Sequence, residues 1–189
     1  MTELLKLNLG SGQNPRTGYL NVDRAGSPDL WVDLEKVPWP WDTSSVGEVV
    51  FNHVLEHLGE TVQGYYGIIK ELYRVCAAGA AIHIVVPHPR HDDFLSDPTH
   101  VRIITPRSLS LFSKAQNRQW AKEKSANSPL GLYLDVDFEV ESASFILEEP
   151  WASQFVNKQI SDEELHQATL RYNNVVKEIR VVMKVIKTA

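Results

Sequence analysis

Cysteine is almost missing from this chain: Cys76 is the only one among 189 residues. A single cysteine cannot form a disulfide within the chain, and nothing else indicates an oxidising compartment, so we expect a cytoplasmic protein. Long apolar runs are missing too, because no segment approaches the ~18 residues of a membrane span. Residues 1–6 lack the basic and then apolar layout of a signal peptide. We therefore expect neither secretion nor a membrane partner.

Positive charge is in short supply, with 19 Lys and Arg against 24 Asp and Glu and a net charge of −5. The basic residues are scattered and form no stripe that could neutralise many phosphates, which argues against duplex nucleic acid as a partner. Hydrophobic residues make up 43% of the chain and charged residues 23%, as is usual for a globular protein. We expect one domain over residues 1–189, with the oligomeric state left open.

Short apolar segments that end in glycine or aspartate dominate the first half of the chain. They predict strands at 4–9, 19–23, 29–34, 46–52 and 80–86. A three- and four-residue spacing of apolar side chains predicts a helix over 62–76. The strand at 80–86 is almost wholly apolar, which is typical of a strand covered by helices on both faces.

The second half opens with a polar stretch, 88–105, which is long enough to need a function. A helix should begin at Pro106 with Thr105 as its cap, and Ser161 with Glu164 has the spacing of a capping box that opens another. Alternating residues predict a strand over 132–147 with a bulge near Ser142, and a last strand follows over 175–186. The order of elements predicts a mostly parallel sheet with an antiparallel closing pair.

Polar residues stand where the first three predicted strands end. Gly10-Ser-Gly12 would let the backbone approach a ligand closely, although such a motif alone is at least as often an ordinary turn. Asp23 ends the second strand, where a carboxylate can accept both hydroxyls of a ribose. Asp33 and Leu34 end the third strand, where an adenine would lie. The two acids together predict an adenosine pocket.

With these motifs, residues 5–112 resemble the class I S-adenosylmethionine-dependent methyltransferases, and a Val54-Leu-Glu-His57 signature strengthens the likeness. The resemblance implies an α/β, Rossmann-like three-layer sandwich whose seven-stranded sheet is mostly parallel with an antiparallel last strand. It also implies methyl transfer from S-adenosylmethionine to an oxygen or nitrogen of a small or medium-sized acceptor. The cofactor-binding residues that it implies are Leu9, Gly10, Ser11, Gly12, Asp23, Asp33, Leu34, Asn52 and His53.

This sequence departs from the family pattern in three places. The gap between Gly12 and Asp23 is too short for a crossover helix, which leaves open how the methionine carboxylate is bound. The first strand carries Asn8 instead of the commoner acid, and Gly47-Glu48 stands where many relatives have an aspartate. None of these departures removes the two adenosine acids.

Histidines gather after the fourth and fifth predicted strands. His53 or His57 could be a catalytic base that deprotonates the acceptor, or both rings could be structural. The His53-Val-Leu-Glu-His57 segment also matches the H-x-x-E-H pattern of inverted zinc proteases, but that motif belongs within a long helix and this one directly follows an apolar strand.

Ubiquinone-pathway O-methyltransferases and small-RNA 2′-O-methyltransferases, which this segment also resembles, hold a divalent metal with an acid-x-x-Glu-His version of it. The resemblance implies a metal held by His53, Glu56 and His57, helped by His88, His91 or His100. In this chain His53 replaces the acid of that pattern.

The polar stretch supplies the candidate acceptor-binding residues, because it follows the fifth strand beside the expected methyl group. They are His88, His91, Asp92, Asp93, His100 and Arg102. The alternative is a solvated loop whose charges pair with one another. Two other functions stay open, an NAD-dependent oxidoreductase and a non-catalytic module that binds an adenosine cofactor. The missing third glycine of G-x-G-x-x-G argues against the oxidoreductase.

Overall fold

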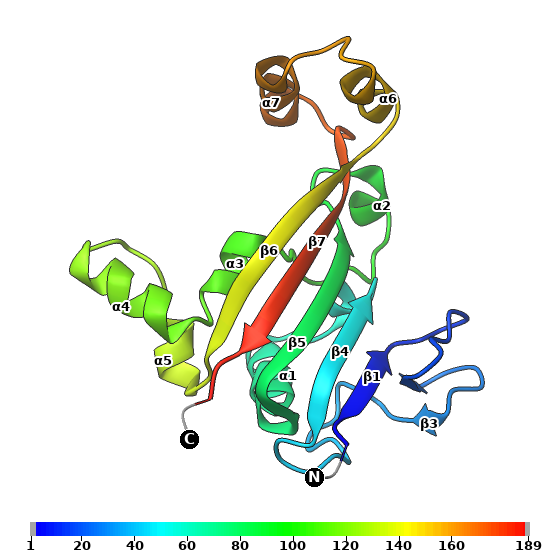
Figure 1. Ribbon diagram of the computed structural model, residues 1–189, viewed down its shortest axis with the longest axis vertical. Coiled ribbons are helices and arrows are strands. Elements are labelled where there is room, and N and C mark those ends of the chain that lie inside the picture. Colours follow the sequence, from blue (N-terminus) through cyan, green and yellow to red (C-terminus); the bar gives the residue numbers. More distant parts are fainter. Residues whose placement is uncertain (1–2, 188–189) are drawn as a thin grey trace.

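The computed structural model describes residues 3–187 and shows a seven-stranded sheet with the order β3-β2-β1-β4-β5-β7-β6 (Figure 1). Strand β7 runs antiparallel to both of its neighbours, and the other strand pairs are parallel. The Rossmann-like α/β class and the antiparallel last strand are thus confirmed. The strands are β1 (Leu5–Leu9), β2 (Leu20–Asp23), β3 (Leu30–Trp31), β4 (Val46–Asn52), β5 (Cys76–Pro87), β6 (Phe138–Leu147) and β7 (Val176–Val185).

Helix starts follow the capping residues expected from the sequence. Thr105 and Ser161 each form a capping box, with Ser108 and Glu164 respectively. Thr61 caps the long helix after β4, because its side chain accepts a hydrogen bond from the backbone N–H of Gly64. The helices are η1 (Leu55–His57, a 3-10 turn), α1 (Val62–Val75), α2 (Asp92–Leu95), α3 (Pro106–Ser110), α4 (Lys114–Lys122), α5 (Leu130–Leu134), α6 (Trp151–Val156) and α7 (Asp162–Arg171).

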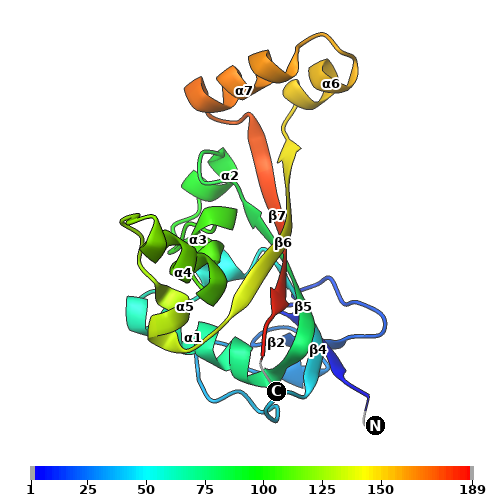
Figure 2. The same ribbon diagram turned by 60° about the vertical axis from the view of Figure 1, so that its left-hand side comes forward.

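The helices that pack along the sheet lie on one of its faces, and Figure 2 shows α1, α3, α4 and α5 all on that side. Along β5, Ile82, Ile84 and Val86 are buried against them, whereas His83 and Val85 on the opposite face are only half-buried. The expectation that helices cover both faces of 80–86 is therefore wrong. The physical reason is the short β1–β2 connection: a loop without a helix stands where the third layer of the sandwich would begin.

The expected strand at 132–147 begins only at Phe138, and the prediction for 132–137 is wrong. Residues Leu130–Leu134 form α5, which ends at Asp135 in the left-handed region (φ 53°). Contacts with the preceding helices hold this turn in place: Gly131 N–H donates to the carbonyl of Leu111, and Leu132 N–H donates to Oδ1 of Asn117. Tertiary hydrogen bonds here outweigh an alternating pattern. The bulge is confirmed as a register shift between Val140 and Ser142.

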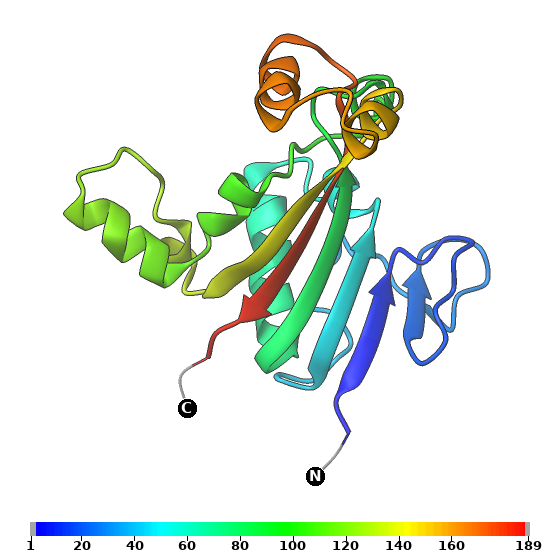
Figure 3. The ribbon, with the colours of Figure 1, turned by 45° about the horizontal axis from the view of Figure 1, so that its top comes forward.

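The core lies between this helical face and the sheet, and Phe51, Phe112 and Phe138 are fully buried within it. Strands β6 and β7 extend beyond this core (Figure 1). Helices α6 and α7 lie at their far end, above α2 in Figure 1 and in front in Figure 3. No helix in residues 3–187 is long and apolar enough to cross a membrane. The carboxyl ends of β1, β2, β4 and β5 meet at one edge, where the functional residues gather.

Candidate functional site

The loop after β1 contains two glycines with positive φ, Gly10 (68°) and Gly12 (51°). A Cβ on Gly10 would lie 2.4 Å from Cγ2 of Val54, whereas a Cβ on Gly12 would meet nothing within 4 Å. The backbone N–H groups of Gly10 and Ser11 both donate to the carbonyl of Val22, at 2.8 and 3.0 Å. The loop is thereby tied to β2, and Gly10 is required by its own packing against Val54.

A cleft of about 210 Å³ opens beside this loop and brings Asp23, Asp33 and Leu34 together, as the sequence predicts. The carboxylate of Asp23 accepts the N–H of Gly12 at 2.7 Å on one oxygen and the N–H of Ala25 at 3.0 Å on the other. Carboxylate oxygens have two lone pairs each, so Asp23 is held in place and can still accept further hydrogen bonds. We call this the adenosine cleft.

A second cleft, of about 770 Å³, adjoins the first and shares Gly10 and His53 with it. It is lined by polar residues, including the predicted Ser11, Gly12 and Asn52 and the unpredicted Gln13, Asn14 and Arg16. Arg16 is the only lysine or arginine in this lining. Arg16 could have been predicted from the sequence, because it is an arginine in the short loop that replaces a crossover helix. The predicted Leu9 lines neither cleft, because its side chain is buried in the core.

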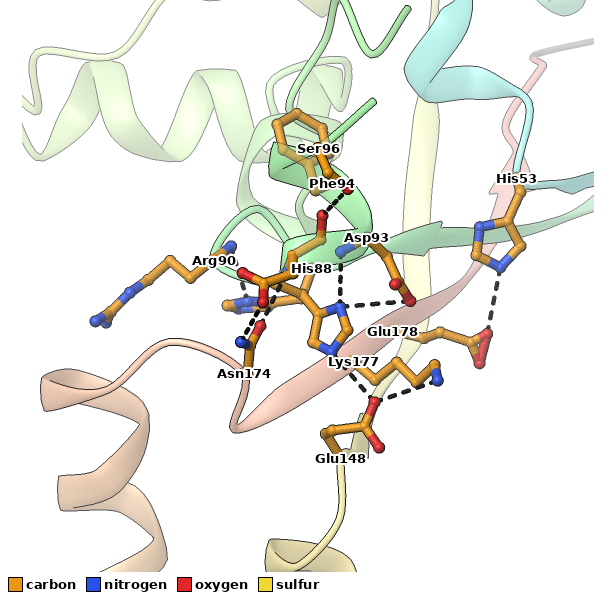
Figure 4. Close-up of polar contacts among 12 residues, drawn as sticks. His53, His88, Arg90, Asp93, Phe94, Ser96, Glu148, Asn174, Lys177 and Glu178 are labelled. Atoms are coloured by element: carbon orange, nitrogen blue, oxygen red, sulfur yellow. Dashed lines mark hydrogen bonds and ion pairs between the residues drawn. The ribbon is translucent and has the colours of Figure 1, made fainter. Parts of the chain in front are cut away.

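His53 directly follows β4 with a positive φ of 55°, which places its ring at both clefts. Its Nδ1 lies 3.5 Å from Oε1 of Glu56, and its Nε2 lies 3.4 Å from Oε2 of Glu178 on β7 (Figure 4). These carboxylates, Glu56 foremost, raise the pKa of His53 above its ordinary value. Glu178 could not be predicted from the sequence, because its contact with His53 spans 125 residues and has no local signature.

Glu56, His57 and His100 form a cluster whose ligand atoms all lie within 4.8 Å of one another. Glu56 is fully buried, and neither of its carboxylate oxygens has a hydrogen-bond partner in the described part of the chain. Burying such a carboxylate costs free energy unless a hydrogen-bond donor or a cation compensates it.

The two histidines of the cluster are oriented as metal ligands usually are. Nδ1 of His57 lies 3.0 Å from Oγ1 of Thr99, and Nδ1 of His100 lies 3.0 Å from the carbonyl of Phe94. These contacts engage Nδ1 of each ring, so Nε2 is the nitrogen available to a metal. One carboxylate and two imidazoles suit a divalent transition metal. The predicted ligand His53 lies beside this cluster and contacts Glu56, and His100 completes the set in its place.

The candidate acceptor residues do not share one surface. His91 is buried with its Nε2 3.2 Å from Oε2 of Glu148, and Asp92 accepts a hydrogen bond from Nδ2 of Asn174 at 2.8 Å. These contacts fasten α2 to the ends of β6 and β7, where Figure 4 shows Glu148 and Asn174. Asp93 lies 3.4 Å from Nδ1 of the same His91.

Arg102 lies apart from these residues, whereas the carbonyl of His88 accepts a hydrogen bond from the N–H of His91 at 2.9 Å. The guanidinium of Arg102 stacks on the ring of Tyr65, 4.0 Å from its centroid, and donates to the carbonyl of Gly59. His88 lines a separate cavity under α7. All six residues stay predictions as acceptor contacts, and three of them, His91, Asp92 and Arg102, also make contacts that hold the structure together.

No protein-family model and no curated protein sequence matches the chain. Among solved structures, a SAM-dependent methyltransferase from Archaeoglobus fulgidus aligns with TM-score 0.61 at 16% identity, over 96% of this chain and 86% of its own. The 1,6-didemethyltoxoflavin-N1-methyltransferase of Burkholderia thailandensis aligns with TM-score 0.54 at 10% identity, over 97% and 71%. An S-adenosylmethionine-dependent methyltransferase from Mesorhizobium loti aligns with TM-score 0.50 at 13% identity, over 96% and 90%. The chain therefore has the fold of the S-adenosylmethionine-dependent methyltransferases.

Proposed function

We propose that this protein transfers a methyl group from S-adenosylmethionine to an oxygen or nitrogen of a small or medium-sized acceptor. The observation that carries the proposal is the pair of strand-end acids, Asp23 and Asp33, which line one cleft beside the positive-φ loop at Gly10. In an open α/β sheet, ligands bind outside the carboxyl ends of the strands. Both the methyltransferase fold and the acids of this cleft therefore favour S-adenosylmethionine as the ligand.

In this proposal each of the two clefts binds one part of S-adenosylmethionine. The carboxylate of Asp23, fixed by two backbone N–H groups, accepts the ribose hydroxyls, and Asp33 with Leu34 contacts the adenine. Arg16 pairs with the methionine carboxylate, taking over the role that a helix N-terminus would have after a longer β1–β2 connection. When bound, S-adenosylmethionine supplies an electrophilic methyl group at the junction of the clefts.

His53 lines both clefts and His57 lines the cleft with Asp23 and Asp33, and in this proposal the acceptor lies beside these two rings. Alignment of acceptor and cofactor by the clefts contributes most of the catalysis, as in any in-line displacement. Two carboxylates favour the protonated form of His53, which makes His53 a poor base and leaves His57 as the candidate base. His53 then serves as a donor that orients the acceptor.

The cluster of Glu56, His57 and His100 fits a divalent metal, since it offers two oriented imidazoles and a buried carboxylate that, within residues 3–187, accepts no hydrogen bond and has its one ion-pair contact with His53, at 3.5 Å. When bound, the ion supplies a Lewis acid that polarises an acceptor hydroxyl. His57 serves either as a ligand or as a base, and the presence of metal decides which.

Calorimetry with S-adenosylhomocysteine and with NAD tests the proposal against the oxidoreductase alternative. We expect S-adenosylhomocysteine to bind and NAD to fail, because the loop lacks the third glycine that a dinucleotide fingerprint needs. Release of labelled methyl from S-adenosylmethionine to a metabolite pool then separates an enzyme from a non-catalytic module. Tight NAD binding without S-adenosylhomocysteine binding would reverse the assignment.

A further inference from the structure

The cavity under α7 lies between that helix, α6 and the outer ends of β6 and β7, and it has a volume of about 460 Å³. We call it the α7 cavity. Its apolar lining comes from four separate elements and consists of Phe145, Leu147, Phe155, Leu165 and Val176. Phe145 is 52% exposed and Phe155 is 37% exposed, so two aromatic side chains face solvent at the same place. A cavity of this size with such a lining is typical of a small-molecule site.

The polar residues of the α7 cavity restrict the charge of a ligand. Its lining contains one carboxylate, Asp162, two histidines, His88 and His166, and no lysine or arginine, so a neutral ligand is favoured over an anionic one, which would face the carboxylate without a permanent cation. His88 accepts the N–H of Arg90 at Nδ1, and burial lowers its pKa. The neutral ring therefore carries its hydrogen on Nε2 and can donate to an oxygen of a neutral ligand.

The end of β5 lies between His53 at the reacting edge and His88 in the α7 cavity. The backbone N–H of His53 donates to the carbonyl of Val85, and His88 lies three residues further along. At about 3.3 Å per residue, His88 is about 10 Å from that hydrogen bond. Figure 4 shows His53 with Glu178 at one end of this path and His88 at the other.

Resting on the proposed methyl transfer, we propose that the α7 cavity binds the apolar ring portion of a neutral methyl acceptor. The acceptor is then an elongated molecule, a ring system joined to a hydroxyl or amine that reaches His53. This arrangement explains why α6 and α7 stand beyond the sheet with exposed aromatic residues beneath them.

Binding of 1-naphthol, followed by amide chemical shifts of the labelled full chain, tests the site. We expect shifts in α6 and α7 and at least tenfold weaker binding of naphthalene-1-sulfonate, which has the same rings with a negative charge. Thr169→Trp and Leu165→Trp place an indole in the cavity from one face of α7 and should each weaken 1-naphthol binding at least tenfold. Leu170→Trp, on the exposed side of the same helix, is the matched control and should leave binding unchanged.

Equal 1-naphthol affinity in Thr169→Trp and Leu170→Trp, or displacement of S-adenosylhomocysteine by 1-naphthol, would overturn the site. Both tryptophan variants in the cavity should keep the wild-type affinity for S-adenosylhomocysteine, which shows that they fold. Binding of S-adenosylhomocysteine without binding of 1-naphthol contradicts this inference alone. The converse result contradicts the proposed function and, with it, the acceptor role.

A separate experiment tests whether the α7 cavity binds the methyl acceptor. Labelled methyl transfer to 4-(1-naphthyl)butan-1-ol should exceed transfer to butan-1-ol at equal concentration by at least tenfold, because only the first can occupy the α7 cavity. Thr169→Trp should remove this preference, and Leu170→Trp should retain it. Equal transfer to the two alcohols by the wild-type protein would overturn the role.

Discussion

The cofactor edge and the acceptor edge of the candidate site are built in different ways. At the cofactor edge Asp23 is held by Gly12, eleven residues away. At the acceptor edge His91 reaches Glu148 across 57 residues, and His53 reaches Glu178 across 125. A cofactor site made of adjacent strand ends and tight loops is local, whereas an acceptor site needs the returning strands β6 and β7. We therefore expect substitutions at the cofactor edge to change cofactor affinity, and substitutions at the acceptor edge to change turnover with little effect on cofactor affinity.

The largest effect is expected at Gly10, where a side chain would break the cofactor edge. Gly10→Val should abolish binding of S-adenosylhomocysteine and lower the free energy of unfolding by about 2–5 kcal/mol, through strain at positive φ and overpacking. Denaturant unfolding and calorimetry measure both quantities.

The clash with Val54 can be tested separately by Gly10→Ala with Val54→Ala, which should recover part of the stability that Gly10→Ala loses. Gly18→Ala, where a Cβ would meet open space at an equally positive φ, should keep cofactor binding. Wild-type stability of Gly10→Val would show that the loop can rearrange.

Removal of metal should act on the acceptor edge alone. Excess chelator should abolish methyl transfer and leave S-adenosylhomocysteine affinity unchanged, and Mg²⁺, Mn²⁺ or Zn²⁺ should restore activity. His100→Ala should raise the metal concentration that half-maximal activity needs by about 10- to 100-fold or more, because the cluster loses one ligand. Full activity in chelator would leave His57 as the base without a metal.

Asp23→Ala should weaken S-adenosylhomocysteine binding by about 1.5–3 kcal/mol, the scale of charged hydrogen bonds. The carboxylate also fixes the N–H groups of Gly12 and Ala25, so the loop loosens as the ribose contact is lost. Asp42→Ala, an exposed acid that lines neither cofactor cleft, is the control. Unchanged affinity in a folded Asp23→Ala variant would remove this acid from the site.

Arg16→Ala tests the two clefts of the cofactor edge separately. It should weaken S-adenosylhomocysteine binding about tenfold, since a charged hydrogen bond to the carboxylate is lost. The affinity for 5′-methylthioadenosine, which has no carboxylate, should not change. Arg118→Ala, an exposed arginine on α4, should affect neither ligand. An equal loss for both ligands would place Arg16 at the adenosine instead.

The smallest overall effect is expected for His91→Ala. The imidazole joins α2 to Glu148, so its loss should disturb the acceptor edge and lower turnover. S-adenosylhomocysteine affinity should stay within a factor of about two, as for distant independent sites. Calorimetry and steady-state kinetics on the same preparation measure the two. A large loss of cofactor affinity would mean that the two edges are coupled through β5.

The sequence by itself determined the sheet and the cofactor edge. Parallel strands bring their carboxyl ends together, so residues such as Asp23 and Asp33 that follow those strands must meet once the strands are recognised. Capping residues such as Thr105 and Ser161 likewise act within one turn of the chain. These predictions depend on local patterns, and local patterns can be read without a structure.

Only the tertiary structure decided the acceptor edge. It brought Glu178 to His53, put His100 in place of His53 in the candidate metal cluster, formed a helix over residues 130–134, and assembled the α7 cavity from segments that are distant in sequence. Each of these outcomes depends on which side chains meet after β6 and β7 return to the sheet. Contacts between distant segments have no periodic signature, because packing and hydrogen-bond geometry in three dimensions select them.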